Sequence, residues 1–558
     1  EAAFLTSRYD AMSALIDTVV EHARTWHAEA TVEAIRIKAR IAEGAHREAL
    51  EVAFRMLDRV DVVLPREPAM DDILAAFGMA NAAIGERVAG DFLDQPLCSD
   101  PDRVLAMELL MSAAPSAYFA LPNNFLIINF HLVKLSVEHG FTVPSIYGYI
   151  VFGMLNSGVF GDTVRGYAFG RLAWDLMERH RAHQQIGRCA MIWGTFVGHW
   201  TDHAIDGAKI MLDKFRAAEE VGDLEHATYS VLQALMIEVL VGRNLHELEE
   251  RYAEPVEWTF QAKQFVGVAL VAPYYQAVLC LLDEGKTEPY LTGSLFDWDA
   301  GCKEGHDVGF TMLPAYSSVG QAMIAIVFRD WDLAEQAVAE AERTADQLTS
   351  HYGLACTNFY RSLVCAQQAR TADGEARAAL LERIATNQAQ LDTWASAAPA
   401  NHRHKHALVQ ALVHGLEDRP MDAMRSFQAA VAGARAGAFI NEEAIALELL
   451  ADLMDEQQLD EPATGYRRRA MRLYARWGAA GKVAAMRAAH DELAQSERGD
   501  PGAPGLRTTI TTTATGGGGQ LDLHSFMKAG RSISEEIDLD RLLGRVMEVV
   551  IENAGADR

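Results

Sequence analysis

Apolar residues recur every three to four positions along the chain from Ala2 to about Leu493. This spacing is typical of amphipathic helices, and the segments between breaks are about 12–16 residues long. No segment alternates apolar and polar residues as a half-buried strand would. The breaks that we expect between helices lie at residues 65–68, 95–101, 122, 140–144, 161–162, 222–223, 242 and 399–401. The pattern therefore predicts an all-α chain of helices joined by short turns.

Four of the predicted helices carry residues, most of them small, at positions i, i+4 and i+7. These positions share one helix face and allow a second helix to approach closely. The same spacing characterises the second helix of tetratricopeptide (TPR) repeats, whose period is about 34 residues. The sets are Ala49, Ala53 and Met56; Gly166, Gly170 and Ala173; Ala334, Val338 and Ala341; and Ala423, Phe427 and Ala430. We expect residues 1–494 to form a right-handed α-solenoid of degenerate TPR-like hairpins, with a concave face suited to binding.

The composition changes sharply after the helical region. Residues 495–520 are rich in Pro, Thr and Gly and end in four consecutive glycines, Gly516–Gly519. Such a segment buries little apolar surface, so we predict a flexible linker. Helical spacing returns in residues 521–558, where Asp538 is a predicted helix N-cap. The apolar positions of this separate C-terminal helix, which we expect to support a weak homodimer, are Leu539, Leu542, Leu543, Val546, Met547 and Val550.

The ends of the sequence and its cysteines bear on its context. The sequence begins with Glu1, carries no signal-peptide pattern, and ends within the last helical block. We therefore expect a segment of a longer protein. The six cysteines are scattered without a Cys-x-x-Cys pair, which predicts reduced thiols in a cytoplasmic protein.

The formal net charge of −27, from 77 acidic and 50 basic residues, disfavours nucleic acid as a partner. The densest basic run, Arg467–Arg469, falls in a helical pattern and is interpreted as a solvated helix face. The most apolar stretch, Ile146–Phe160, is interrupted by Gly148, Gly153 and Gly158. It is shorter than the roughly 20 residues that a spanning helix needs, so we predict no membrane span.

Candidate chemistry is sparse. His402, His404 and His406, with His414 further on, could suggest zinc, but they would point in different directions on a helix and alternate with Arg403 and Lys405. We interpret this run as the polar start of a helix.

His199, among aromatic residues, is interpreted as a core histidine. Gly481-Lys482 lacks the flanking residues of a phosphate-binding loop, and no hydrolase, kinase or zinc-protease motif occurs. We predict a non-enzymatic segment with no catalytic, cofactor or metal site.

Five stretches of the sequence carry a family resemblance: residues 161–180, 195–200, 222–229, 400–409 and 472–483. They resemble the TPR-like region of large bacterial signalling proteins, in which a serine/threonine kinase and an AAA/STAND-type ATPase precede it. A GAF domain and a histidine-kinase or cyclase output follow it in that family. Residues 521–556 are similar to the lead-in to the GAF domain, whereas residues 1–68 match only as generic TPR.

The resemblance implies a sensory or regulatory segment between an ATPase and an output domain. One hypothesis is an interaction module that binds a protein or peptide and couples it to the flanking domains. The alternative is a small-molecule sensor with an apolar pocket enclosed by the helices around Tyr147–Trp200. A long polar groove would favour the first hypothesis, and a closed apolar cavity would favour the second.

Overall fold

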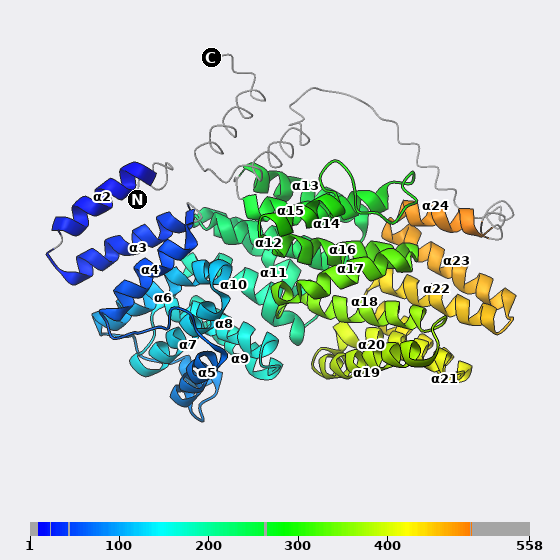
Figure 1. The fold of residues 1–558 in the computed structure, drawn as a ribbon, viewed down its shortest axis with the longest axis horizontal. Coiled ribbons are helices and arrows are strands. Elements are labelled where there is room, and N and C mark those ends of the chain that lie inside the picture. The colour runs from blue at the N-terminus through cyan, green and yellow to red at the C-terminus, as the bar shows by residue number, and fades with distance from the viewer. Residues whose placement is uncertain (1–8, 23, 43–44, 262–264, 491–492, 494–558) are drawn as a thin grey trace, which may run out of the picture. The chain divides into compact units, whose positions relative to one another are not determined.

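The computed structural model describes residues 9–22, 24–42, 45–261, 265–490 and 493. The predicted linker and C-terminal helix, including Leu539–Val550, lie outside these residues. Regular structure among the described residues is helical, with 23 α-helices and only two isolated β-bridges. The predicted all-α, solenoid-like class is therefore confirmed (Figure 1). The chain divides into two compact units, one formed mainly by residues up to Val197 and the other mainly by residues from Gly198.

The first unit is a series of antiparallel helices. Its long hairpins pair α6 with α7 and α8 with α9, and α4 and α5 pack on α6 and α7. The elements are α2 (Tyr9–His22), α3 (Trp26–Ala42), α4 (His46–Asp58), α5 (Met70–Ile84), η1 (Ala89–Phe92), α6 (Pro101–Ala120), α7 (Pro122–His139), α8 (Val143–Gly158), α9 (Thr163–Arg179), η2 (His183–Gln185), α10 (Ile186–Ile192) and the π-helical η3 (Trp193–Val197).

The second unit repeats the hairpin more regularly. Helices α12, α14, α16 and α18 pack side by side. Helices α13, α17 and α19 pack against the helices that they follow, whereas α15 packs against α16. The elements are η4 (Gly198–Trp200), α11 (Ala204–Glu220, whose last turn belongs to the first unit), α12 (Leu224–Val241), α13 (Leu245–Gln261), α14 (Phe265–Leu282), α15 (Trp298–Asp307), α16 (Met312–Phe328), α17 (Trp331–Arg343), η5 (Ala345–Leu348), α18 (Tyr352–Gln368), α19 (Gly374–Ala397), α20 (Pro399–Leu416), α21 (Pro420–Ala436), α22 (Ile440–Glu456), α23 (Asp460–Trp477) and α24 (Ala480–Ala489).

The helix boundaries follow from local chemistry. Side chains of Asp100, Asp162 and Asp330 accept hydrogen bonds from backbone N–H groups in the first turns of α6, α9 and α17. These bonds satisfy donors that a helix start leaves unpaired. Gly478 ends α23 in the left-handed conformation that glycine tolerates. The breaks expected from the sequence coincide with the ends of helices, whereas the non-helical segment 283–297 was not anticipated.

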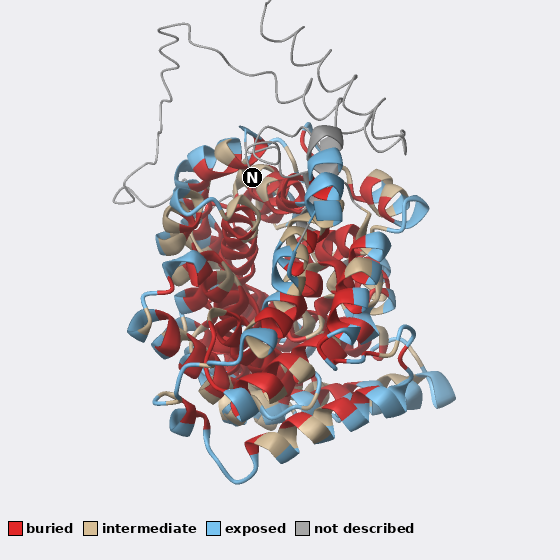
Figure 2. Cartoon of the chain, turned by 90° about the vertical axis from the view of Figure 1, so that its left-hand side faces the viewer, coloured by how far each residue is buried: buried red, intermediate tan, exposed pale blue. Residues whose placement is uncertain are grey.

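Burial separates two kinds of helix. In α16 every residue from Met312 to Val327 is buried, and α8 and α12 are buried at nearly all positions. Helices α17, α21 and α23 bury one face only. Figure 2 shows this contrast as helices that are red throughout and helices with a pale blue outer face. A helix that is apolar all round is stable in water only when other helices enclose it.

The last helices of the second unit pack across the C-terminal ends of earlier ones. Asn441, at the start of α22, donates a hydrogen bond from Nδ2 to the Leu240 carbonyl at the end of α12 (3.1 Å). Trp477 Nε1 donates to the Arg243 carbonyl (3.0 Å). Helix α24 packs on α14 and α16. The final hairpin therefore supplies donors to carbonyl groups that a helix end leaves without partners.

Candidate functional site

The residues predicted to form close helix contacts all lie in the buried cores of their units. They are Ala49, Ala53 and Met56 on α4; Gly166, Gly170 and Ala173 on α9; Ala334, Val338 and Ala341 on α17; and Ala423, Phe427 and Ala430 on α21. The closest approach is at Gly166, where an added Cβ would lie 2.6 Å from the Gly153 carbonyl oxygen of α8. Only glycine permits this helix separation.

Two sequence features that we singled out separately meet in the second unit. Asn401, at the start of α20, donates hydrogen bonds from Nδ2 to the carbonyls of His199 and Asp202, both at 2.8 Å. Its Oδ1 accepts from the Ala204 backbone N–H (3.0 Å). His199 Nε2 lies 3.0 Å from the Ser350 carbonyl, so this histidine belongs to the core. One amide side chain thus fixes the loop between η4 and α11 to α20.

The adjacent turn of α20 carries a buried ion pair. Lys405 Nζ lies 2.8 Å from Glu442 Oε1 on α22, and the two side chains are 0% and 2% exposed. His404 Nε2 lies 2.6 Å from the other oxygen of Glu442. Phe439 lies beneath the ammonium group, 4.3 Å from its ring centroid, and Tyr352 OH is 3.4 Å from Nζ. This Lys405–Glu442–His404 set is called the buried triad below.

The protonation states follow from burial and from the neighbouring charges. Burial and the charge of Lys405 lower the pKa of His404 to about 4, against the opposing effect of Glu442. Burial alone would raise the pKa of Glu442, but Lys405 and His404 hold it below its usual value. At neutral pH the carboxylate can only accept hydrogen bonds, so Nε2 of a neutral His404 carries the proton that it donates. The triad then holds one positive and one negative charge.

His402 lies beside the triad in an aromatic surround. Its ring centroid is 5.9 Å from that of Trp394 and 6.3 Å from those of Trp200 and Tyr352. The side chain is fully buried, and neither ring nitrogen has a hydrogen-bond partner among the described residues. Burial and the charge of Lys405 lower the pKa of His402 far below its usual value. The imidazole is therefore neutral and packs as an aromatic ring.

The burial of these side chains corrects the interpretation of residues 402–406 as the polar start of a helix. Helix α20 does begin at Pro399, but His402, His404 and Lys405 are buried, and only Arg403 is exposed. Phe439 and Glu442 come from α22 and its N-cap and provide the surroundings that make burial favourable. His414 lies two turns further along, where Gln410 and Ser426 contact it. No group of three or more metal-binding side chains occurs within the part of the chain that the structure describes.

A line of polar side chains also joins the inner helices. His351, the N-cap of α18, donates from Nε2 to Gln233 Oε1 of α12 (2.7 Å), since its Nδ1 accepts from the Gly353 N–H. Gln233 Nε2 donates to the hydroxyl of Tyr316 on α16 (3.1 Å). Tyr274 on α14 donates to the Tyr316 carbonyl (2.9 Å). Burial lowers the pKa of His351 to about 3.

A second buried charge cluster lies near the C-terminal end of the unit. Lys482, from the Gly481-Lys482 pair, donates to Glu448 Oε1 of α22 (2.9 Å), and the side chains are only 4% and 5% exposed. The Tyr474 hydroxyl donates to the other oxygen of Glu448 (3.1 Å). Arg329, which follows α16, lies 3.7 Å from Glu448 Oε1. The lysine of the Gly481-Lys482 pair is therefore part of a buried ion pair between helices.

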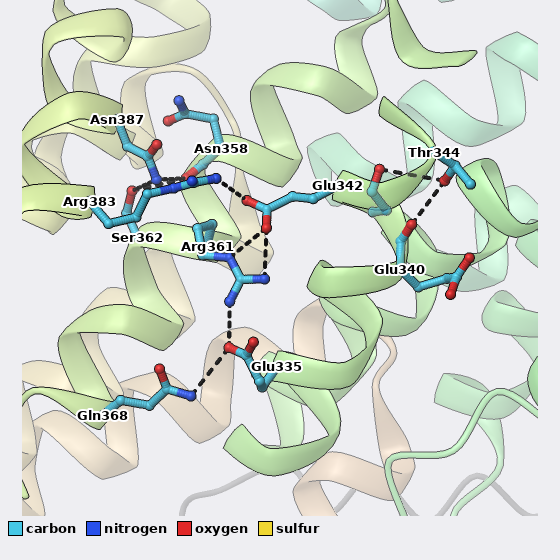
Figure 3. A network of polar contacts seen from close by, with 11 residues as sticks. Glu335, Glu340, Glu342, Thr344, Asn358, Arg361, Ser362, Gln368, Arg383 and Asn387 are labelled. Carbon is cyan, nitrogen blue, oxygen red and sulfur yellow. Dashed lines mark hydrogen bonds and ion pairs between the residues drawn. The ribbon is translucent and has the colours of Figure 1, made fainter. Parts of the chain in front are cut away.

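A third network lies on α17, α18 and α19 (Figure 3). Arg361 of α18 lies between Glu335 and Glu342 of α17, and its NH2 group is 2.8 Å from Glu342. Arg383 of α19 contacts the other oxygen of Glu342 (2.7 Å). Asn387 of α19 donates to the Ser362 hydroxyl (3.1 Å). Three consecutive helices are therefore joined through one carboxylate and two guanidinium groups.

The arrangement defines what the polar groups can do. A general acid or base must reach a substrate, whereas the triad and His402 are enclosed by aromatic and aliphatic side chains. Such clusters fix the register of packed helices. Sequence reasoning missed Glu442, His351 and Tyr352. Glu442 lies in the first turn of α22, where acidic residues are common, so the sequence carries no signal that this side chain is buried.

The comparisons with known proteins give a partial match. No protein-family model matches the chain, and no solved structure matches it significantly. The chain is similar to "Hybrid signal transduction histidine kinase G" of Dictyostelium discoideum, with 24% identity over 180 residues. The match covers 31% of this chain and 5% of the relative, so it concerns a small part of a much longer protein. Among the described helices, none combines the length and apolar character needed to cross a membrane.

Proposed function

We propose that this chain is a non-catalytic interaction and coupling segment of a cytoplasmic signal-transduction protein. The similarity to a hybrid histidine kinase supports the signalling context. The array of helical hairpins supports the scaffold role, because stacked hairpins present an extended surface to a protein or peptide. The flanking kinase, ATPase and GAF domains of the resembled family are part of this proposal.

The main support for the proposal is the burial of the polar side chains. The histidines and lysines that could support chemistry, namely His199, His351, His404, Lys405 and Lys482, are buried and hold helices together. Recognition is then left to the outer faces of α13, α15, α17, α19, α21 and α23. Binding on these faces also suits a segment that passes a signal along the chain, since neighbouring hairpins share one packed core.

The test combines binding with turnover. Peptides selected by display against the purified 558-residue chain should bind saturably in isothermal titration calorimetry, and ATP should be neither hydrolysed nor transferred to the chain. Native mass spectrometry distinguishes the alternative, because a co-purified small molecule would favour a sensor with an enclosed pocket. ATP turnover that survives repurification, or the failure of every selected peptide to bind, would contradict the proposed function.

A further inference from the structure

A row of three exposed arginines lies on the outer face of α23. Arg469, Arg472 and Arg476 follow one another at i, i+3 and i+7, which places them on one side of the helix. All three are exposed, and within the described residues none forms an ion pair with a carboxylate. We call these three residues the basic stripe.

The stripe contrasts with the other arginines of the same region. Arg467, in the same sequence run, is buried and pairs with Asp455. On α21, the exposed Arg435 pairs with Glu443 of α22 at 2.6 Å. In a chain with a net charge of −27, carboxylates are abundant, yet among the described residues none lies within ion-pair distance of the stripe. Like charges on one helix face repel each other and destabilise the helix. An acidic ligand bound to the stripe would reduce this repulsion.

We propose that the stripe binds the acidic stretch Glu535–Asp540 of the same chain. This stretch carries four carboxylates in six residues, and no basic residue occurs between Arg531 and Arg541. Its charge is therefore complementary to the stripe. The stretch precedes most of the apolar positions predicted for the C-terminal helix. Binding of the stretch to the stripe is therefore compatible with dimerisation through that helix.

The chain length permits this contact. Helix α24 packs on α23 and ends at Ala489, and the chain continues from there. The 45 residues from His490 to Ser534 span at most roughly 150 Å when extended. Helix α23 is only about 27 Å long by its 1.5 Å rise per residue. A tethered ligand also has a high effective concentration, which compensates for the small free energy of each exposed ion pair.

Photo-crosslinking in the complete 558-residue chain tests the contact. Gly465 lies one turn before Arg469, and a Cβ at this position would meet no atom within 4 Å, so a benzoylphenylalanine can replace it. We expect irradiation at low salt to link this position to the peptide that contains Glu535–Asp540. The yield should fall at least fivefold at about 0.5 M NaCl, where exposed charges are screened. The triple change Arg469→Glu, Arg472→Glu and Arg476→Glu should reduce it similarly.

Charge exchange gives the decisive comparison. Lysine at Glu535, Glu536, Asp538 and Asp540 should restore the crosslink in the triple variant, whereas Arg403→Glu, at an exposed arginine on α20, should leave the original yield unchanged. Arg472→Glu alone serves if circular dichroism shows that the triple variant misfolds. Crosslinks elsewhere, or a yield insensitive to salt and to charge exchange, overturn the proposal. Crosslinks between isotopically heavy and light chains would assign the stripe to a second copy and also overturn it.

Discussion

Lys405 and Glu442 form an ion pair of 2.8 Å between α20 and α22, with both side chains enclosed by the core. Removing one partner from such a pair leaves an uncompensated charge, which typically costs about 3–5 kcal/mol. We expect Lys405→Met to lower the free energy of urea unfolding by about this amount. Adding Glu442→Gln to Lys405→Met should recover part of the loss. Lys209→Met, at an exposed pair with Asp206, should leave the urea midpoint nearly unchanged.

Acidification should destabilise the second unit before the carboxylates of the surface titrate. The folded-state pKa values of His351 and His404 are about 3 and about 4, both below the ordinary 6.5. Between pH 6.5 and 4 the unfolded chain therefore binds protons that the folded chain excludes, and the free energy of unfolding falls with pH. The loss by pH 4 should be on the order of 3 kcal/mol for each histidine. Glu442, whose pKa is lowered, contributes in the same direction at lower pH.

A matched variant separates this effect from general acid unfolding. His351→Asn retains an N-cap acceptor for the Gly353 N–H but removes the titrating ring. Urea unfolding followed by circular dichroism at pH 7 and 4.5 should show a smaller pH difference for the variant. An equal difference in both proteins would mean that His351 is not kept neutral by the fold.

The two neighbouring histidines of α20 should lose different amounts of stability on the same substitution. His404→Leu deprives the buried Glu442 of a hydrogen-bond donor, which should cost about 1–3 kcal/mol or more. His402→Leu removes two ring nitrogens that have no partner among the described residues, so it should cost less than about 1.5 kcal/mol. Thermal unfolding of both variants measures the order. A larger loss for His402→Leu would reveal a partner that binds its ring.

Helix α21 provides a direct test of the small-residue face. Ala430 is 1% exposed, whereas the adjacent Ala429 faces solvent. Ala430→Trp should destabilise the unit by about 1–3 kcal/mol because it overpacks a close helix contact. Ala429→Trp makes the same residue change at an exposed position, so it should leave the melting temperature almost unchanged. Equal melting temperatures for the two variants would contradict the assignment of this face.

The predicted C-terminal helix should govern self-association. Burying a Leu- or Val-sized side chain contributes about 1.5–3 kcal/mol, so the six apolar positions from Leu539 to Val550 favour pairing between chains. Light scattering should show a dimer at high concentration for the whole chain. A chain ending at Gln495 should remain monomeric. The same mass for both proteins would show that this helix does not cause dimerisation.

The sequence was sufficient for the helices and their packing faces but not for the polar core. Helix ends and small-residue faces depend on residues within a few positions of each other, so local spacing reveals them. The burial of Lys405 depends on Glu442, 37 positions later, and nothing local to α20 distinguishes it from a solvated lysine. Trp477 likewise reaches Arg243 over 234 positions, which a repeat pattern does not encode.

The contacts of Asn441 and Trp477 with the end of α12 constrain how such a protein can evolve. An array with contacts only between neighbours can gain or lose a hairpin without penalty elsewhere. Here an inserted or deleted hairpin between α13 and α22 would carry Asn441 away from Leu240 and Trp477 away from Arg243. The number of hairpins in this unit is therefore fixed by its own ends, and new variation is directed to the turns and outward faces.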